Sequence, residues 1–167
     1  QSNAVILSIG ALKFDRSGDL PASPEVMDSF YVRVARESCE MLGMHVDPET
    51  VQWWAGQNEE IRHEALENTS ERLSIKDALL QLTSWIGRSQ KIWGHGDDFD
   101  CVILSEAYRR CNMKVPWKFW DTRDTRTLFD IAGVKNSDLP ANYKHHPIHD
   151  CYRQVAGVLK SLRKLNL

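Results

Sequence analysis

The sequence lacks the features that mark several protein classes. None of its four cysteines belongs to a C-x-x-C pair, so the spacing of a zinc ribbon is absent. No apolar run approaches the length of a membrane span, and no charged, apolar and small-residue segment marks a secretion signal. We therefore expect no membrane association, and we expect Cys39, Cys101, Cys111 and Cys151 to be thiols in a reducing cytoplasm.

Excess positive charge is also missing. The chain has 21 Lys and Arg against 23 Asp and Glu, a formal net charge of −2. A broad basic surface that grips long duplex DNA is therefore not expected, because such binding depends on many cations that neutralise phosphates. Binding of nucleic acid in a local cleft remains compatible with this composition, since a bound metal ion can supply positive charge there.

What the sequence does contain is typical of one globular domain. Its 167 residues are 42% hydrophobic and 26% charged, and no repeat or linker divides them, so we take 1–167 as a single domain. Strands are predicted at 4–14, 28–34 and 90–94, the first two antiparallel, with another strand or extended segment at 115–120. Helices are predicted from Asp47, over 58–67, from Ser74, and over 99–111, 124–131 and 149–165. This order predicts an α/β domain with one mixed sheet flanked by helices.

A first group of acids follows the predicted strand 90–94, in the segment Trp-Gly-His-Gly-Asp-Asp-Phe-Asp at 93–100. Carboxylates delivered there can converge on Mg²⁺ or Mn²⁺, which prefer oxygen ligands. Asp97 and Asp98 are better explained as helix caps. Asp100 lies inside the first turn of the helix, where it cannot be the cap, so it is the stronger candidate ligand.

A second group lies at 145–151, His-His-Pro-Ile-His-Asp-Cys, at the start of the last predicted helix. A loop can fold His145 over a site that Asp150 enters from the helix, and a His that titrates near neutral pH is a good general base. Two alternatives stay open at this point. The segment can be a solvated His-rich loop, or a zinc site built from His145, His146, His149 and Cys151.

Together the two segments resemble the DEDDh group of 3′–5′ exonucleases, whose fold is RNase H-like. Phe99-Asp100 is similar to the second motif of that group, and His145 followed five residues later by Asp150 matches its third, H-x-x-x-x-D. The likeness is closer to a branch of small bacterial and phage 3′–5′ exoribonuclease-like enzymes that includes a phage exonuclease acting on DNA. Further blocks at 3–11, 50–54, 93–96, 116–120 and 123–128 follow the order of that branch.

The resemblance implies an RNase H-like mixed sheet and a metal-dependent hydrolase. In the family, four carboxylates hold two divalent metal ions, Mg²⁺ or Mn²⁺; one positions the attacking water and the pair stabilises charge at phosphorus. By resemblance Asp100 and Asp150 are metal ligands and His145 is the general base. The expected substrates are 3′ ends of single-stranded DNA or RNA, released as nucleoside monophosphates. A bacterial or phage-infected cytoplasm and a homodimer follow by analogy only.

Several residues are candidates for contact with the substrate. His95 stands where the family usually has Asn, and it can orient a ligand or contact the terminal sugar. Trp53 and Trp54 are adjacent on a predicted helix, so one is expected in the core while the other can stack on a base. Phe99 belongs to the second motif, and Arg126 can hold a phosphate or pair with a neighbouring acid. Trp117 and Trp120 are expected to serve packing.

One family motif is absent. The first, D-x-E, lies in the family on a strand just before the strand that begins here near Asn3. We expect that strand, of roughly five or six residues, upstream of Gln1, because its neighbours would otherwise expose unpaired backbone groups. The alternative is a catalytically inactive relative that binds nucleic acid or a partner protein without cutting.

Overall fold

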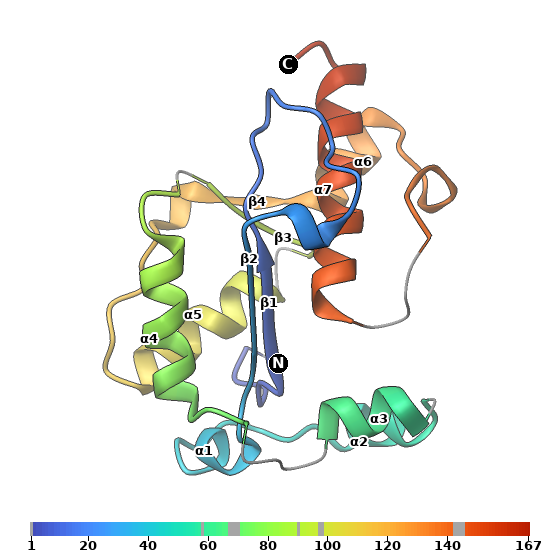
Figure 1. The fold of residues 1–167 in the computed structure, drawn as a ribbon. Coiled ribbons are helices and arrows are strands. Elements are labelled where there is room, and N and C mark those ends of the chain that lie inside the picture. The colour runs from blue at the N-terminus through green and yellow to red at the C-terminus, as the bar shows by residue number, and fades with distance from the viewer. Residues whose placement is uncertain (1, 58, 67–70, 90, 97–98, 142–145) are drawn as a thin grey trace.

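The computed structural model describes residues 2–57, 59–66, 71–89, 91–96, 99–141 and 146–167. The strands are β1 Ser8–Leu12, β2 Ser29–Arg33, β3 Ile92–Gly94 and β4 Thr122–Asp124. The helices are α1 Arg36–Glu40, α2 Pro48–Ala55, α3 Glu59–Leu66, α4 Ile75–Ile86, α5 Asp100–Arg110, α6 Thr125–Ala132 and α7 Pro147–Lys164. The α/β class predicted from the sequence is therefore confirmed (Figure 1). No helix in these ranges is long and apolar enough to cross a bilayer.

Helix starts follow the capping residues that the sequence offers. The side chain of Asp47 accepts a hydrogen bond from the backbone N–H of Glu49 at the start of α2. Ser74 accepts from the N–H of Asp77 at the start of α4. Each cap satisfies a backbone donor that a helix leaves free in its first turn. α1 was not expected from the sequence. The residue before it is Ala35, whose methyl group cannot accept a hydrogen bond, so α1 has no side-chain cap at its start.

The strands form two separate pairs rather than the single mixed sheet that we expected. β1 and β2 are antiparallel, as predicted, with Gly10 opposite Tyr31. β3 and β4 are parallel, with Trp93 opposite Arg123. The segment 115–120, expected to be a strand or an extended segment, forms no strand: the chain pairs with β3 only at Thr122–Asp124, after a short 3-10 helix at Phe119–Asp121.

β1 has one edge that no strand of the described ranges covers. Leu7 O accepts from Val34 N, and Asp28 O accepts from Lys13 N, so the odd-numbered residues of β1 direct their backbone groups to β2. The backbone groups of Ser8, Gly10 and Leu12 consequently point to the opposite edge. We expect the D-x-E strand at this edge, and its presence stays a prediction.

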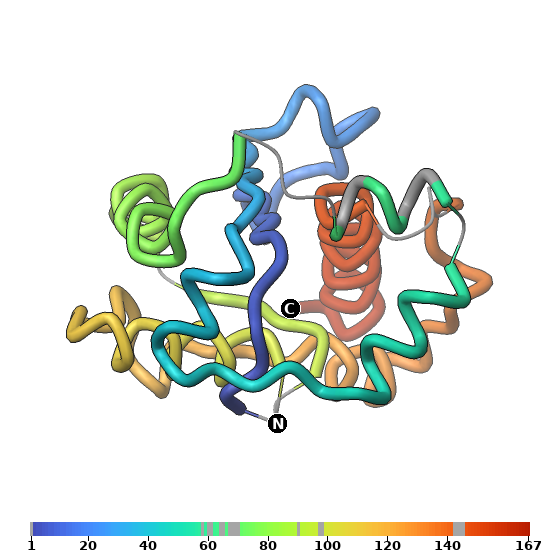
Figure 2. Tube along the Cα trace, turned by 90° about the horizontal axis from the view of Figure 1, so that it is seen from below, coloured from blue at the N-terminus to red at the C-terminus, as the bar shows by residue number. Residues whose placement is uncertain are grey.

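The core lies between the β1–β2 pair and helices on its two sides. α4 and α5 contribute Ile75, Leu79, Ala107 and Tyr108, all at most 1% exposed, to a cluster with residues of β1 and β2. α7 packs along β1 and against α6, as the two views show (Figures 1 and 2). The helices cross closely at Gly157, where an added Cβ would overlap the ring of Phe129. At the other end of α7, an added Cβ on Gly10 would overlap Pro147, so the first turn of α7 lies beside the middle of β1.

Candidate active site

Asp100 and Asp150 each lie in the first turn of a helix, α5 and α7 respectively. Burial and, to a smaller extent, the negative charges of Asp100 and Asp150 raise the pKa of the Cys151 thiol to about 12. The negative charges of the same two carboxylates also act to raise the pKa of His95. Asp100 and Asp150 thus both lie near enough to Cys151 and His95 to act electrostatically on each, although some 50 residues separate the two acids in the sequence.

The turn after β3 holds Asp100 in place. The backbone N–H of His95 donates a hydrogen bond of 2.8 Å to Asp100 Oδ2. Gly94 leaves little room beside it, because an added Cβ would lie 3.3 Å from both Cβ and Oδ2 of Asp100. Gly96 has φ +125°, a backbone conformation that favours glycine. These constraints fix the first carboxylate before any ligand binds.

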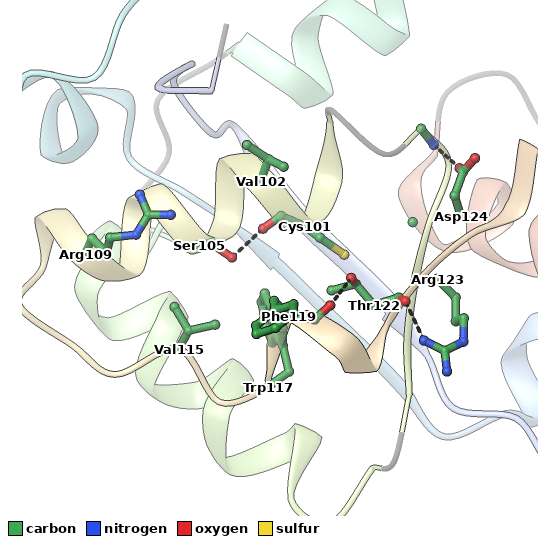
Figure 3. A pocket seen from close by; sticks show the side chains of 12 residues that line it. Cys101, Val102, Ser105, Arg109, Val115, Trp117, Phe119, Thr122, Arg123 and Asp124 are labelled. Carbon is green, nitrogen blue, oxygen red and sulfur yellow. Dashed lines mark hydrogen bonds between the residues drawn. The ribbon is translucent and has the colours of Figure 1, made fainter. Parts of the chain in front are cut away.

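Asp124 ties that turn to the start of α6. Its carboxylate accepts from the N–H groups of Arg126 and Thr127, at 3.3 and 2.9 Å, and so caps α6. The same carboxylate accepts from Gly96 N at 2.9 Å, across the parallel pair β3–β4 (Figure 3). Burial raises the pKa of Asp124, but the hydrogen bonds from Thr127, Gly96 and Arg126 outweigh it and hold the pKa below its usual range. Asp124 is therefore ionised at neutral pH and acts as a positioning residue.

His95 is half-buried between these elements. Its Nδ1 lies 2.7 Å from Oγ1 of Thr125, a side chain with no solvent exposure. Burial and the nearby Arg126 lower the pKa of His95, while Asp100, Asp124 and Asp150 oppose that shift. The net shift is downward, so the imidazole is neutral at pH 7. A neutral ring fixed by Thr125 can exchange a hydrogen bond with a ligand but adds no permanent charge to the site.

Of the other predicted substrate contacts, two adjoin the elements of this cluster and two lie on α2. Phe99 is 60% exposed and immediately precedes α5. Arg126 is exposed, with its guanidinium beside Gly96. Trp53 and Trp54 lie on α2, outside the cluster, with ring centroids 4.9 Å apart. α2 has no buried residue, so the expectation that one of the two tryptophans belongs to the core was wrong.

Some sequence expectations fall on residues that the structure does not describe. His145, Asp97 and Asp98 lie outside the described residues. His146 and His149 are described, and their ring centroids lie 5.3 Å apart. Trp120 was expected to serve packing, but it is 55% exposed. Trp117 does pack, edge-on against Tyr108 with centroids 5.7 Å apart.

The donors of the cluster, two carboxylates, are of the oxygen type that a hard divalent cation prefers. Within the described ranges no three His, Cys, Asp or Glu side chains form a group that could hold a metal ion. Mg²⁺ keeps several waters and is commonly bound through one or two carboxylates together with substrate phosphates. Asp100 and Asp150 therefore fit one such ion held jointly with a phosphate, and a structural zinc site at His146, His149 and Cys151 is not supported.

The positioning roles of two residues were not predicted from the sequence. A helix was predicted from Asp124, and an Asp at that position is typical of an N-cap. Its second role, toward Gly96, depends on the pairing of β3 with β4, which local sequence does not reveal. Thr125 carried no signal, because nothing in the chain marks it as the partner of a histidine 30 residues away.

Replacing Asp124 with Ala is expected to lower the free energy of unfolding by about 2–3 kcal/mol, since the helix cap is lost and the Gly96 N–H loses its acceptor. Ser74→Ala is the matched control, because Ser74 also caps a helix but makes no such link, and should cost about 1 kcal/mol. Urea denaturation measures both. Equal losses in the two variants would show that the link to Gly96 contributes nothing to stability.

Comparison with models of known protein families gives a match. A family model described as the 3′–5′ exoribonuclease Rv2179c-like domain matches residues 1–162, nearly the whole chain. No curated protein and no solved structure matches. The match includes both carboxylates of the cluster and the turn that holds Asp100.

Proposed function

The chain belongs to the Rv2179c-like 3′–5′ exoribonuclease domain family, and from this premise we propose that it is a metal-dependent 3′–5′ exonuclease. It removes nucleoside monophosphates from the 3′ ends of single-stranded RNA or DNA. The observation that carries this proposal is the convergence of Asp100 and Asp150 on Cys151 and His95. Two carboxylates on neighbouring helix starts are what a cation bound to a phosphodiester requires.

The roles of the residues follow from their chemistry. Asp100 and Asp150 would hold the divalent ion, Mg²⁺ or Mn²⁺, and the bound ion would polarise the scissile phosphate and lower the pKa of an attacking water. His145 is proposed as the general base that takes the proton of that water. His95, with its ring fixed by Thr125, would orient the terminal nucleotide. Trp53, Trp54, Phe99 and Arg126 remain proposed substrate contacts.

We also propose that the fold is RNase H-like. An antiparallel pair, a parallel pair and helices on both sides support this assignment, and the edge of β1 that no described strand covers is the proposed place for a further strand. Such a strand would bring the two carboxylates of D-x-E to the cluster and allow a second ion. A homodimer and a cytoplasmic location are carried by analogy alone.

A second candidate is a relative that binds nucleic acid without cutting it. It is favoured by the absence of a three-ligand metal group among the described residues. The two candidates make opposite predictions for the purified protein.

The wild-type protein is expected to shorten a 5′-labelled 20-nucleotide single strand from its 3′ end in Mn²⁺ or Mg²⁺, and to stop on addition of EDTA. Gel electrophoresis follows the strand, and chromatography identifies the released nucleoside monophosphate. Parallel RNA and DNA strands compare the two substrates. Binding without release in either metal would favour the non-cutting relative, and release unaffected by EDTA would contradict metal dependence.

A further inference from the structure

A pocket of about 480 Å³ adjoins the carboxylate cluster. It lies between α5, the segment before β4, and the two parallel strands (Figure 3). Gly94 and Gly96 line it, and these residues also form the turn that holds Asp100. The pocket is large enough for a nucleobase with part of its sugar and phosphate. The pocket therefore shares the turn Gly94–Gly96 with the proposed catalytic site.

One wall of the pocket is aromatic. Trp117, Phe119 and Val115 all line the pocket there (Figure 3). Trp117 is anchored from behind by its edge-on contact with Tyr108, whereas Phe119 is 82% exposed. Trp120 continues the aromatic surface outside the pocket, and Lys118 Nζ lies 5.1 Å from the centre of its ring. Exposed rings beside cations are typical of surfaces on which single-stranded bases stack.

Two arginines stand at opposite ends of this wall (Figure 3). Arg109 forms an ion pair with Glu106, so its charge is partly balanced. Arg123 Nη1 donates to the backbone oxygens of Trp120 and Thr122, at 2.8 and 2.7 Å. No acid among the described residues forms an ion pair with it. Its guanidinium is thus held at the pocket by neutral carbonyls with its charge available to an anion.

From this arrangement we propose that the pocket binds one nucleotide of a single-stranded nucleic acid. Its base lies against Phe119 and Trp117, and its phosphate pairs with Arg123. A duplex is not accommodated in this way, because its bases are stacked on one another and cannot reach the rings. The inference rests on the proposed function for the class of substrate, and it adds a second place at which the strand is held, separate from Asp100 and Asp150.

The test measures binding apart from cutting. Fluorescence anisotropy of 5′-fluorescein-labelled U10 and dT10 in EDTA reports the affinity of the full chain without hydrolysis. Phe119→Ala is expected to weaken binding of both strands about tenfold, because one stacked base is lost. Arg123→Gln is expected to weaken binding about fivefold and to reduce the salt dependence by about one phosphate contact.

Two matched variants control for general effects. Ile131→Ala removes another exposed apolar side chain, 67% exposed on α6, and Arg16→Gln removes another exposed cation. Both should bind as the wild type does. Unchanged affinity in Phe119→Ala and Arg123→Gln would overturn the proposal. So would light scattering that shows a dimer dissociated by Phe119→Ala with oligonucleotide affinity unchanged, since the rings would then contact a second copy.

A parallel assay of nucleotide release in Mn²⁺ separates the two proposals. A wild-type protein that releases nucleotides while both pocket variants bind normally retains the proposed function and loses the pocket. A wild-type protein that binds strands through Phe119 and Arg123 but releases nothing supports the pocket and contradicts the exonuclease.

Discussion

Replacing Asp150 with Asn is expected to lower the rate of nucleotide release about 10³-fold or more while the protein stays folded. A bound metal supplies several kcal/mol of transition-state stabilisation, and each 1.36 kcal/mol corresponds to a factor of ten in rate. Asn keeps the size of the side chain but removes the negative charge that binds the cation. Because Asp150 lies in the first turn of α7, the change also removes a favourable interaction with the helix dipole, worth at most about 1 kcal/mol.

Two measurements separate loss of metal from loss of fold. Calorimetric titration with Mn²⁺ should show weakened binding in Asp150→Asn, and far-UV circular dichroism should show an unchanged helix content. Asp130→Asn is the matched control, because it removes an exposed carboxylate on α6 outside the cluster and should leave release unchanged. Full activity of Asp150→Asn would contradict its assignment as a metal ligand and with it the proposed mechanism.

Helices were the part of the fold that the sequence predicted best, because their signals are local. Ser74 and Asp47 stand before α4 and α2, and each accepts a hydrogen bond within three residues. α1 was missed because only five residues form it and no side chain caps it. The apolar positions of α7 predicted its buried face correctly, since Val155, Val158, Leu159 and Leu162 are all buried.

Strand pairing was less predictable because it depends on residues far apart in the sequence. The antiparallel partners β1 and β2 are close enough in the chain for alternation to predict them. A strand or extended segment was expected at 115–120, where no strand forms: Pro116 lacks a backbone donor, and Phe119 and Trp120 are exposed. The partner of β3 is β4, which is only three residues long and ends at Asp124, whose carboxylate reaches back to Gly96.

The residues of the candidate site also differ in whether a local sequence signal marks them. Asp100 and Asp150 were proposed from the sequence because each stands in a short segment that resembles a motif of fixed spacing. The residues that position the turn, Asp124 and Thr125, act across the β3–β4 pair and carry no motif. The aromatic pocket escaped for a related reason: its walls come from α5, β4 and the irregular segment between them, so only the folded chain assembles it.

Replacing Gly10 with Ala is expected to reduce nucleotide release about 100-fold, although Gly10 belongs to a strand and touches no substrate. An added Cβ would lie 2.5 Å from Cβ of Pro147 and 3.1 Å from its carbonyl carbon. A proline ring and backbone cannot swing aside, so the first turn of α7 must shift and carry Asp150 with it. A displacement of about 1 Å in a catalytic group can cost about 10²-fold in rate. The overpacking should also lower the free energy of unfolding by about 1–3 kcal/mol.

The close contact between β1 and α7 is tested by a second substitution that relieves the overlap. Pro147→Gly removes the Cβ that Gly10→Ala would strike, so the double variant should be less impaired than the sum of the single changes predicts. Gly56→Ala controls for the loss of a glycine: its φ is −84°, and the added Cβ would lie 3.5 Å from the nearest atom, an ordinary contact. It should be neutral or slightly stabilising. If Gly10→Ala releases nucleotides at the wild-type rate at a temperature where it is folded, the packing of β1 against α7 does not set the position of Asp150. If it loses release and the double variant regains part of it, the close approach at Gly10 is what holds the second carboxylate opposite the first.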